Sequence, residues 1–196
     1  MTYKQRLMGV TLSLVAAMAC ARAPQRPVAT PAVSGSPAVT TVILVRHAEK
    51  VDNSSDPELS AAGMERANTL VEVVKQARVT SIITTQFRRT RATAAPAAAA
   101  LGLEPRVITT SGAAHAREVA DTVKAHGGGV LLIVGHSNTV PAIIAALGAA
   151  APAPICDSEY DDLFVVTLPG DGRPPIVVRT RYGAVSPRGV GCPPVK

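Results

Sequence analysis

The chain has 196 residues, of which 47% are hydrophobic and 17% charged, and its formal net charge is +6. This length fits one domain, and the composition excludes a wholly disordered chain, which would combine low hydropathy with high net charge. A basic chain raises the hypothesis of nucleic-acid binding. However, aromatic residues make up only 3% and there is no tryptophan, so unpaired bases have little to stack on.

The positive charge lies at the two ends of the chain. Residues 1–39 hold four basic and no acidic residues, and residues 170–196 hold five basic residues and one acidic residue. The stretch 40–169 holds 11 basic and 13 acidic residues. The central part of the chain is therefore mildly acidic, and we expect no nucleic-acid partner.

Residues 1–20 have the pattern of an export signal peptide. Two basic residues precede the uncharged apolar run 7–19, which is shorter than the roughly 20 residues that span a bilayer. The segment Ala-Met-Ala-Cys ending at Cys20 resembles a bacterial lipobox, in which this cysteine carries the lipid. Cleavage after the Ala-Arg-Ala segment 21–23 is the alternative. We expect an exported protein that is periplasmic, anchored to the membrane through lipid, or secreted.

The remaining chain divides into three parts by composition. Residues 21–39 are rich in Pro and Ala and predict a disordered tether. Residues 40–183 contain the strand and helix patterns and predict the folded domain. Residues 184–196 form a C-terminal tail.

Apolar strand patterns alternate with helical patterns from residue 40. Strands are predicted at 41–45, 81–84, 106–108, 130–134, 163–168 and 176–181, and helices at 60–77, 88–100, 117–125 and 139–147. Ser60 is suited to cap the first helix, and Pro96 predicts a kink or an early end of the second. The alternation predicts a three-layer α/β/α fold, with a mostly parallel central sheet and a C-terminal antiparallel hairpin.

Two cysteines flank the predicted hairpin. If Cys20 carries a lipid, then Cys156 and Cys192 remain as a pair. A hairpin brings its outer ends together, which is the geometry that a disulfide needs. We expect this disulfide, and two unrelated thiols are the alternative.

Three of the predicted parallel strands run into residues that suit phosphate chemistry. The first is followed by Arg46 and His47, another by His136, and a third by a segment containing Arg89. Because the carboxyl ends of parallel strands meet at one edge of a sheet, we expect these side chains to converge. Guanidinium groups bind phosphate oxygens, and a neutral imidazole can serve as a nucleophile toward phosphorus.

These segments resemble the histidine phosphatase superfamily. The resemblance rests on Arg46-His47, on the Thr-Thr-x-x-x-Arg-Thr-x-x-Thr-Ala pattern of residues 84–94, on Gly-His-Ser-Asn at 135–138, and on Leu-Ser-Ala-Ala-Gly at 59–63. It covers about residues 40–183. The similarity is to the compact, phosphoglycerate-mutase-like branch and its small phosphohistidine-phosphatase-like members, which implies the phosphoglycerate-mutase-like fold.

The resemblance implies a role for each matching residue. His47 corresponds to the phosphorylated nucleophile, Arg46 and Arg89 to phosphate-binding residues, and His136 to the second histidine of the pocket, with both catalytic and phosphate-binding roles. Larger members supply a glutamate after the second motif, but the segment 113–118 has no convincing equivalent. Glu49 is therefore the candidate general acid.

The remaining histidines and charged residues are interpreted as surface positions, and no metal site is expected. His115 and His126 lie in polar or glycine-rich surroundings and are predicted at the surface, as is Glu118. Arg88 and Arg91 are offset around the helix from Arg89 and are interpreted as rim or surface charges. No His-x-x-x-His or Cys-x-x-Cys spacing occurs, and two arginines would repel a cation, so we expect neither a metal nor another cofactor.

The sequence therefore predicts a metal-independent phosphomonoester hydrolase that forms a phosphohistidine intermediate on His47. Its partners would be a small phosphorylated substrate or a phosphoprotein. One alternative is a phosphoglycerate-mutase-type phosphotransferase, which the short chain and the expected export disfavour. The other is a module that binds phosphate or a phosphoprotein without turnover.

Overall fold

The computed structural model describes residues 38–187. The signal peptide, Cys20, Cys192 and most of the tether and of the tail lie outside this range. Export, lipidation and the pairing of Cys156 with Cys192 therefore stay predictions. Within residues 38–187, no helix is long and apolar enough to cross a membrane.

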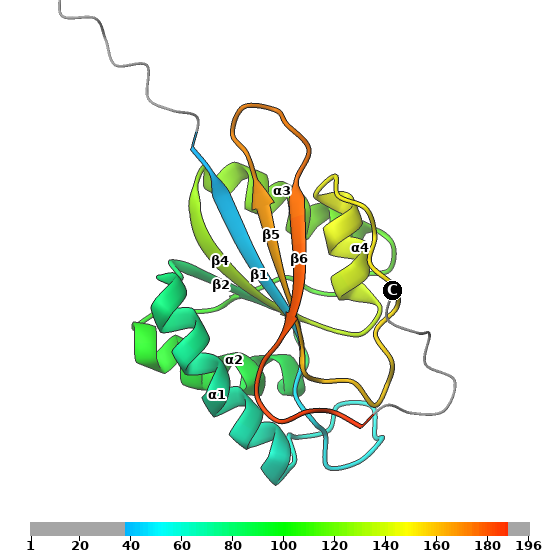
Figure 1. The fold of residues 1–196 in the computed structure, drawn as a ribbon. Coiled ribbons are helices and arrows are strands. Elements are labelled where there is room, and N and C mark those ends of the chain that lie inside the picture. The colour runs from blue at the N-terminus through cyan, green and yellow to red at the C-terminus, as the bar shows by residue number, and fades with distance from the viewer. Residues whose placement is uncertain (1–37, 188–196) are drawn as a thin grey trace, which may run out of the picture. The chain divides into compact units, whose positions relative to one another are not determined.

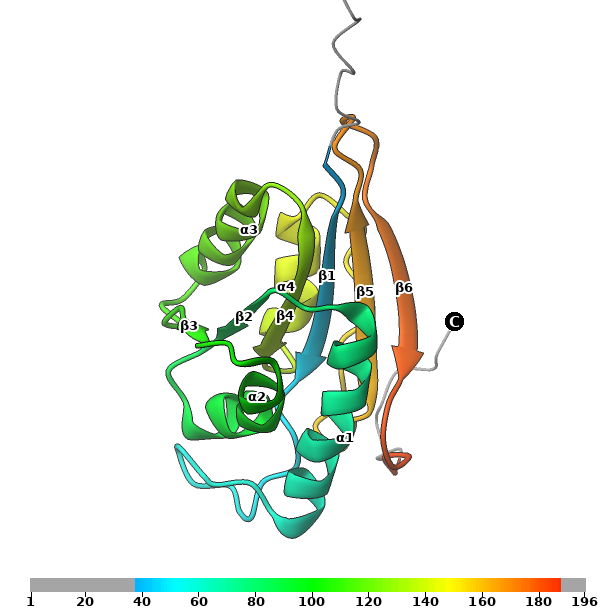
Figure 2. The ribbon, with the colours of Figure 1, turned by 90° about the vertical axis from the view of Figure 1, so that its left-hand side faces the viewer.

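A mixed sheet of six strands forms the middle layer (Figure 1), and its order β3-β2-β4-β1-β5-β6 can be followed in Figure 2. The strands are β1 (Thr40–Arg46), β2 (Ser81–Thr84), β3 (Arg106–Val107), β4 (Gly129–Gly135), β5 (Asp162–Leu168) and β6 (Ile176–Arg181). The first four run parallel, whereas β5 is antiparallel to β1 and β6 is antiparallel to β5. This confirms the mostly parallel sheet with a C-terminal antiparallel hairpin.

Helices cover both faces of the sheet, which confirms the three-layer fold. In Figure 2, α1 lies in front of the strands and α4 behind them. The helices are α1 (Ala61–Ala77), α2 (Arg88–Leu101), α3 (Ala114–His126) and α4 (Thr139–Ala146).

Alternate residues of β1 pack into two separate cores. Val42 and Leu44 belong to the cluster that includes α3 and α4, whereas Ile43 and Val45 belong to the cluster that includes α1 and α2. All four are buried, because successive side chains of a strand point to opposite faces. Each such burial stabilises the fold by about 1.5–3 kcal/mol relative to leaving the side chain exposed. A strand whose two faces are both covered therefore has apolar residues at successive positions of the sequence.

The start of α1 and the end of α2 test the predictions made for Ser60 and Pro96. Ser60 is the N-cap of α1, and its hydroxyl accepts a hydrogen bond from the Gly63 backbone amide at 3.2 Å, as predicted. In α2 the helix continues past Pro96 to Leu101, which confirms the predicted extent and excludes the early end, one of the two effects predicted for this proline. The side chains of Ala94 and Ala97, on either side of Pro96, are fully buried in the core, so tertiary packing holds this helix together.

The start of α1 packs closely on the chain that follows β1. Gly63 is buried, and a methyl group there would overlap the Glu49 carbonyl oxygen and lie 3.0 Å from the Glu49 backbone nitrogen. Both are backbone atoms, which cannot move aside as a flexible side chain would. The Ser60 amide donates to the same Glu49 carbonyl at 2.9 Å. The absence of a side chain at position 63 therefore allows α1 to approach residues 47–50.

We predict that Gly63→Ala destabilises the protein by about 1–3 kcal/mol, because the added methyl group forces α1 away from the Glu49 backbone. An unhindered Gly→Ala change inside a helix would instead stabilise by about 0.5–1 kcal/mol, so the sign of the change is informative. Urea unfolding measures the difference, with the exposed Asn68→Ala in the same helix as control. An unfolding free energy of Gly63→Ala equal to or above that of the wild type would contradict the packing.

Candidate active site

The pairing of β1 with β4 brings two histidines together. The strands are in parallel register with Arg46 opposite Gly135, and the His47 backbone amide donates to the Gly135 carbonyl at 2.9 Å. His136 follows Gly135, and the centroids of the His47 and His136 rings lie 5.4 Å apart. Both side chains are buried. The structure therefore brings these two predicted site residues together at the carboxyl edge of the sheet.

The surroundings of His47 leave one ring nitrogen available as a nucleophile. Its Nδ1 lies 2.9 Å from the Ala48 carbonyl oxygen, which can only accept, so Nδ1 carries the proton and Nε2 keeps its lone pair. Burial lowers the pKa of His47 to about 3, and the charges of Arg46, His136 and Arg89 add to this effect. The imidazole is therefore neutral over the whole physiological pH range.

A chain of hydroxyl groups orients His136. Its Nε2 lies 3.0 Å from the Thr85 hydroxyl, which lies 2.8 Å from the Thr90 hydroxyl, which donates to the Phe87 carbonyl at 2.9 Å. Because the carbonyl can only accept, each hydroxyl donates toward it and Nε2 of His136 carries the proton. Nδ1 is then the acceptor for the Arg89 guanidinium at 3.4 Å. Burial, followed by the charge of Arg89, lowers the pKa of His136 to about 4.

Contacts outside the site hold the two arginines in place. Nη1 of Arg46 donates to the carbonyl oxygens of Cys156 at 2.7 Å and Glu159 at 3.0 Å. Its guanidinium lies 4.3 Å from the centre of the Tyr160 ring. Arg89 stands in the first turn of α2, with its guanidinium carbon 4.2 Å from the centre of the Phe87 ring.

These four side chains line a cavity of about 320 Å³ at the carboxyl edge. Lys50 and Asp157 also line it, as do residues 137–139 at the start of α4, where the helix dipole favours negative charge. The cavity is thus lined by three cationic side chains, by the start of α4 and by two neutral imidazoles. The cations are Arg46, Lys50 and Arg89, and the imidazoles are those of His47 and His136. This arrangement is suited to bind a phosphate group and to present one imidazole nitrogen to it.

The structure does not bring Glu49 to this cavity, contrary to the prediction of a general acid there. Its carboxylate accepts hydrogen bonds from Nε of Arg66 at 3.0 Å and from Nη2 at 2.7 Å. Arg66 is itself buried and donates to the carbonyl oxygens of Tyr182 at 2.9 Å and Ala184 at 2.8 Å. Arg66 thus binds both oxygens of the Glu49 carboxylate and holds the side chain toward α1. Glu49 thus ties the segment after β1 to α1 and to the end of β6.

The remaining histidines divide between interior and surface. The predicted surface position of His115 is wrong: its side chain is buried and Nδ1 lies 3.2 Å from the Thr109 carbonyl. The reason is that α3 begins at Ala114, three residues earlier than predicted, and turns His115 toward the sheet. His126 is exposed, as predicted. Arg88 and Arg91 are exposed as well, and Arg88 forms an ion pair with Glu58.

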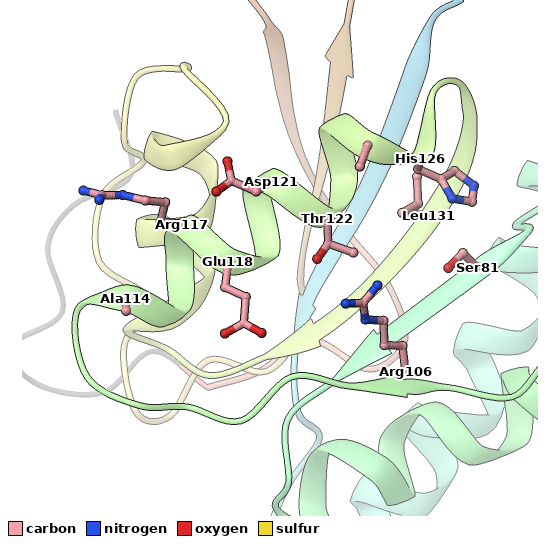
Figure 3. A pocket seen from close by; sticks show the side chains of 10 residues that line it. Ser81, Arg106, Ala114, Arg117, Glu118, Asp121, Thr122, His126 and Leu131 are labelled. Carbon is pink, nitrogen blue, oxygen red and sulfur yellow. The ribbon is translucent and has the colours of Figure 1, made fainter.

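A second, larger cavity of about 650 Å³ lies away from the strand-end histidines (Figure 3). It is lined by Ser81 and Arg106, which begin β2 and β3, and by residues of α3, including Glu118 and His126. Glu118 is exposed on α3, as predicted, and does not line the histidine cavity. In residues 38–187, no group of three His, Cys, Asp or Glu side chains could hold a metal ion in either place.

Comparison with known proteins agrees with this geometry. Residues 42–111 match the family model of the Histidine phosphatase superfamily (branch 1). The matched segment contains Arg46, His47 and Arg89, whereas His136 lies beyond it. No curated protein sequence matches the chain.

Solved structures of phosphatases share the fold. The protein histidine phosphatase SixA, complexed with tungstate, is 19% identical, with a TM-score of 0.57 over 74% of this chain and 96% of that chain. Mycobacterial glucosyl-3-phosphoglycerate phosphatase is 16% identical, with a TM-score of 0.55 over 74% of this chain and 99% of that chain. Phosphoserine phosphatase from Entamoeba histolytica is 17% identical, with a TM-score of 0.55 over 74% of this chain and 98% of that chain. At these identities the likeness establishes the fold.

We predict that the two buried histidines make the protein less stable as the pH falls below about 6.5, their usual pKa. In the folded state their pKa values lie near 3 and 4, so between those values and 6.5 the unfolded chain binds more protons. Each histidine should therefore cost about 2 kcal/mol of unfolding free energy at pH 5 relative to pH 7.5. Urea unfolding at several pH values measures this loss.

The control for this prediction is a pair of variants. In His47→Asn/His136→Asn the loss between pH 7.5 and pH 5 should be smaller by several kcal/mol, because neither side chain titrates. The exposed His126→Asn should keep the wild-type slope. The same slope in the double variant as in the wild type would show that the buried imidazoles do not stay neutral.

Proposed function

We propose that this protein is a metal-independent phosphomonoester hydrolase that acts through a phosphohistidine on His47. One observation carries the proposal: a buried, neutral imidazole with its Nε2 lone pair available lines the same cavity as Arg46, Arg89 and His136. The match of residues 42–111 to the histidine phosphatase superfamily supports it, as does the fold shared with phosphatases.

The first half of the reaction transfers the phosphoryl group to the protein. Arg46 and Arg89 bind the phosphoryl oxygens, and Nε2 of His47 attacks phosphorus in line with the leaving oxygen. The P–N bond forms while the P–O bond to the leaving group breaks, and the leaving oxygen takes up a proton. The guanidiniums neutralise the charge on the transferring group, an effect typically worth about 3–4 kcal/mol for each donor in a dry site.

The second half returns the phosphoryl group to water. A base takes a proton from water as its oxygen attacks phosphorus, and the P–N bond breaks to restore neutral His47. With Nε2 bonded to Thr85, His136 donates to a phosphoryl oxygen only by taking up a proton at Nδ1. A bound phosphate dianion favours that uptake, since an opposite charge stabilises the imidazolium. We therefore expect His136 to be neutral in the empty cavity and protonated beside the phosphate.

The position of Glu49 favours a second candidate function. Because its carboxylate is held by Arg66, the predicted acid is missing from the cavity, as it would be in a module that binds phosphate without turnover.

The substrate of the hydrolase would be a small phosphate ester or a phosphoprotein, since the cavity is about 320 Å³ in volume.

We predict that His47→Ala abolishes phosphatase activity, with a fall in kcat/KM of more than about 10³-fold, because no other group supplies the nucleophile. The assay is hydrolysis of an aryl phosphate, of small alkyl phosphates and of a phosphohistidine peptide, in the presence of a chelator. His126→Ala, which removes an exposed histidine outside the cavity, should keep wild-type activity.

Two outcomes would contradict the hydrolase. Full activity in His47→Ala would exclude this nucleophile. Binding of inorganic phosphate by the wild type without turnover of any of these esters would favour the binding module.

A further inference from the structure

The cavity contains one carboxylate within the described part of the chain, and it belongs to Asp157. Asp157 lies in the loop between α4 and β5. Hydrolysis of an ester with a poor leaving group needs a proton donor, and Glu49 points to Arg66 instead of the cavity. Asp157 is therefore the residue to consider for this role.

Backbone and side-chain contacts brace the loop around Asp157. The carbonyl oxygens of Cys156 and Glu159, on either side of it, both accept from Nη1 of Arg46. The Glu159 amide donates to the Cys156 carbonyl at 3.0 Å, and the Cys156 amide donates to the buried Glu159 carboxylate at 3.2 Å. The turn is thus fixed to the same arginine that faces the cavity, which keeps Asp157 at its rim.

The Asp157 carboxylate lies close to the Arg46 guanidinium but remains open to solvent. Its Oδ1 lies 3.5 Å from Nη2 of Arg46, yet its side chain is 97% exposed. Arg46 is buried, so the solvent-exposed partner of this ion pair is Asp157. Glu49 differs in both respects, since its side chain is 23% exposed and Arg66 binds both of its oxygens.

His47 and Asp157 line the same cavity but differ in exposure. His47 is buried, whereas the Asp157 side chain is open to solvent, so we expect a leaving group that departs from His47 toward solvent to leave on the side of Asp157. Asp157 stands at this rim, beside the guanidinium that holds a phosphoryl oxygen. Arg46, Lys50 and Arg89 are the cations that line the cavity with it.

We propose that Asp157 is the catalytic acid and base of the site, an inference that rests on the proposed function. In the first step the Asp157 carboxyl gives its proton to the leaving oxygen as the P–O bond breaks and the P–N bond to His47 forms. In the second step the carboxylate takes a proton from water while the new P–O bond forms and the P–N bond breaks. The sum is ester plus water to alcohol plus phosphate, with Asp157 and His47 restored.

The test compares substrates whose leaving groups differ in their need for a proton. For an alkyl phosphate, Asp157→Asn should lower kcat/KM by about 10²–10⁴-fold, the usual contribution of a general acid. For 2,4-dinitrophenyl phosphate, whose phenolate leaves without a proton, kcat/KM should be nearly unchanged. The parameter kcat/KM reports the first step, so loss of the base in the second step does not affect it.

Two further variants serve as controls. Asp171→Asn makes the same change at an aspartate in the turn between β5 and β6, outside the cavity, and should leave both substrates unaffected. Glu49→Gln should keep the wild-type ratio between the two substrates, even if the loss of its contact with Arg66 lowers stability.

The outcomes separate this inference from the proposed function. If His47→Ala is inactive but Asp157→Asn slows both substrates equally, or neither, Asp157 is not the acid. If Glu49→Gln alone shows the selective loss, Glu49 is the acid and the assignment of Asp157 is wrong. An active His47→Ala overturns both proposals.

Discussion

The parallel register of β1 and β4 is the constraint on which the site depends. Arg46 lies opposite Gly135, so the residues that follow, His47 and His136, leave the sheet side by side with their rings 5.4 Å apart. A slip of one residue would turn each side chain of β1 to the other face. In the observed register the apolar side chains of β1 alternate between the two cores. The hydrophobic core therefore sets the geometry of the histidines as well as the stability of the fold.

Burial of the site also sets its chemistry. Because water is excluded from His47 and His136, both imidazoles stay neutral beside two guanidiniums, which a solvent-exposed pair would not do to the same degree. Arg46 links the two sides of the cavity, since it is the last residue of β1 but its guanidinium bonds to the loop before β5. A single guanidinium thus connects the nucleophile segment to the carboxylate at the rim.

Local patterns in the sequence were sufficient for the strands, the Ser60 cap and the convergence of Arg46, His47, Arg89 and His136. They were not sufficient for Glu49, whose partner Arg66 lies in α1 and is anchored by carbonyl oxygens at Tyr182 and Ala184. Such contacts between distant segments leave no periodic signal. For Asp157 a signal exists in the topology. The antiparallel β5 begins where β1 ends, so the loop before β5 reaches the same edge of the sheet.

The central claim is that His47 carries the phosphoryl group, and the most direct measurement is to trap it there. Wild-type protein mixed with 2,4-dinitrophenyl phosphate and quenched in alkaline denaturant, where phosphohistidine survives, should gain the mass of one phosphoryl group. Peptide mapping should place this group on Nε2 of His47, and His47→Ala should remain unmodified. Turnover of the ester without any phosphohistidine, or a phosphoryl group on another residue, would contradict the account.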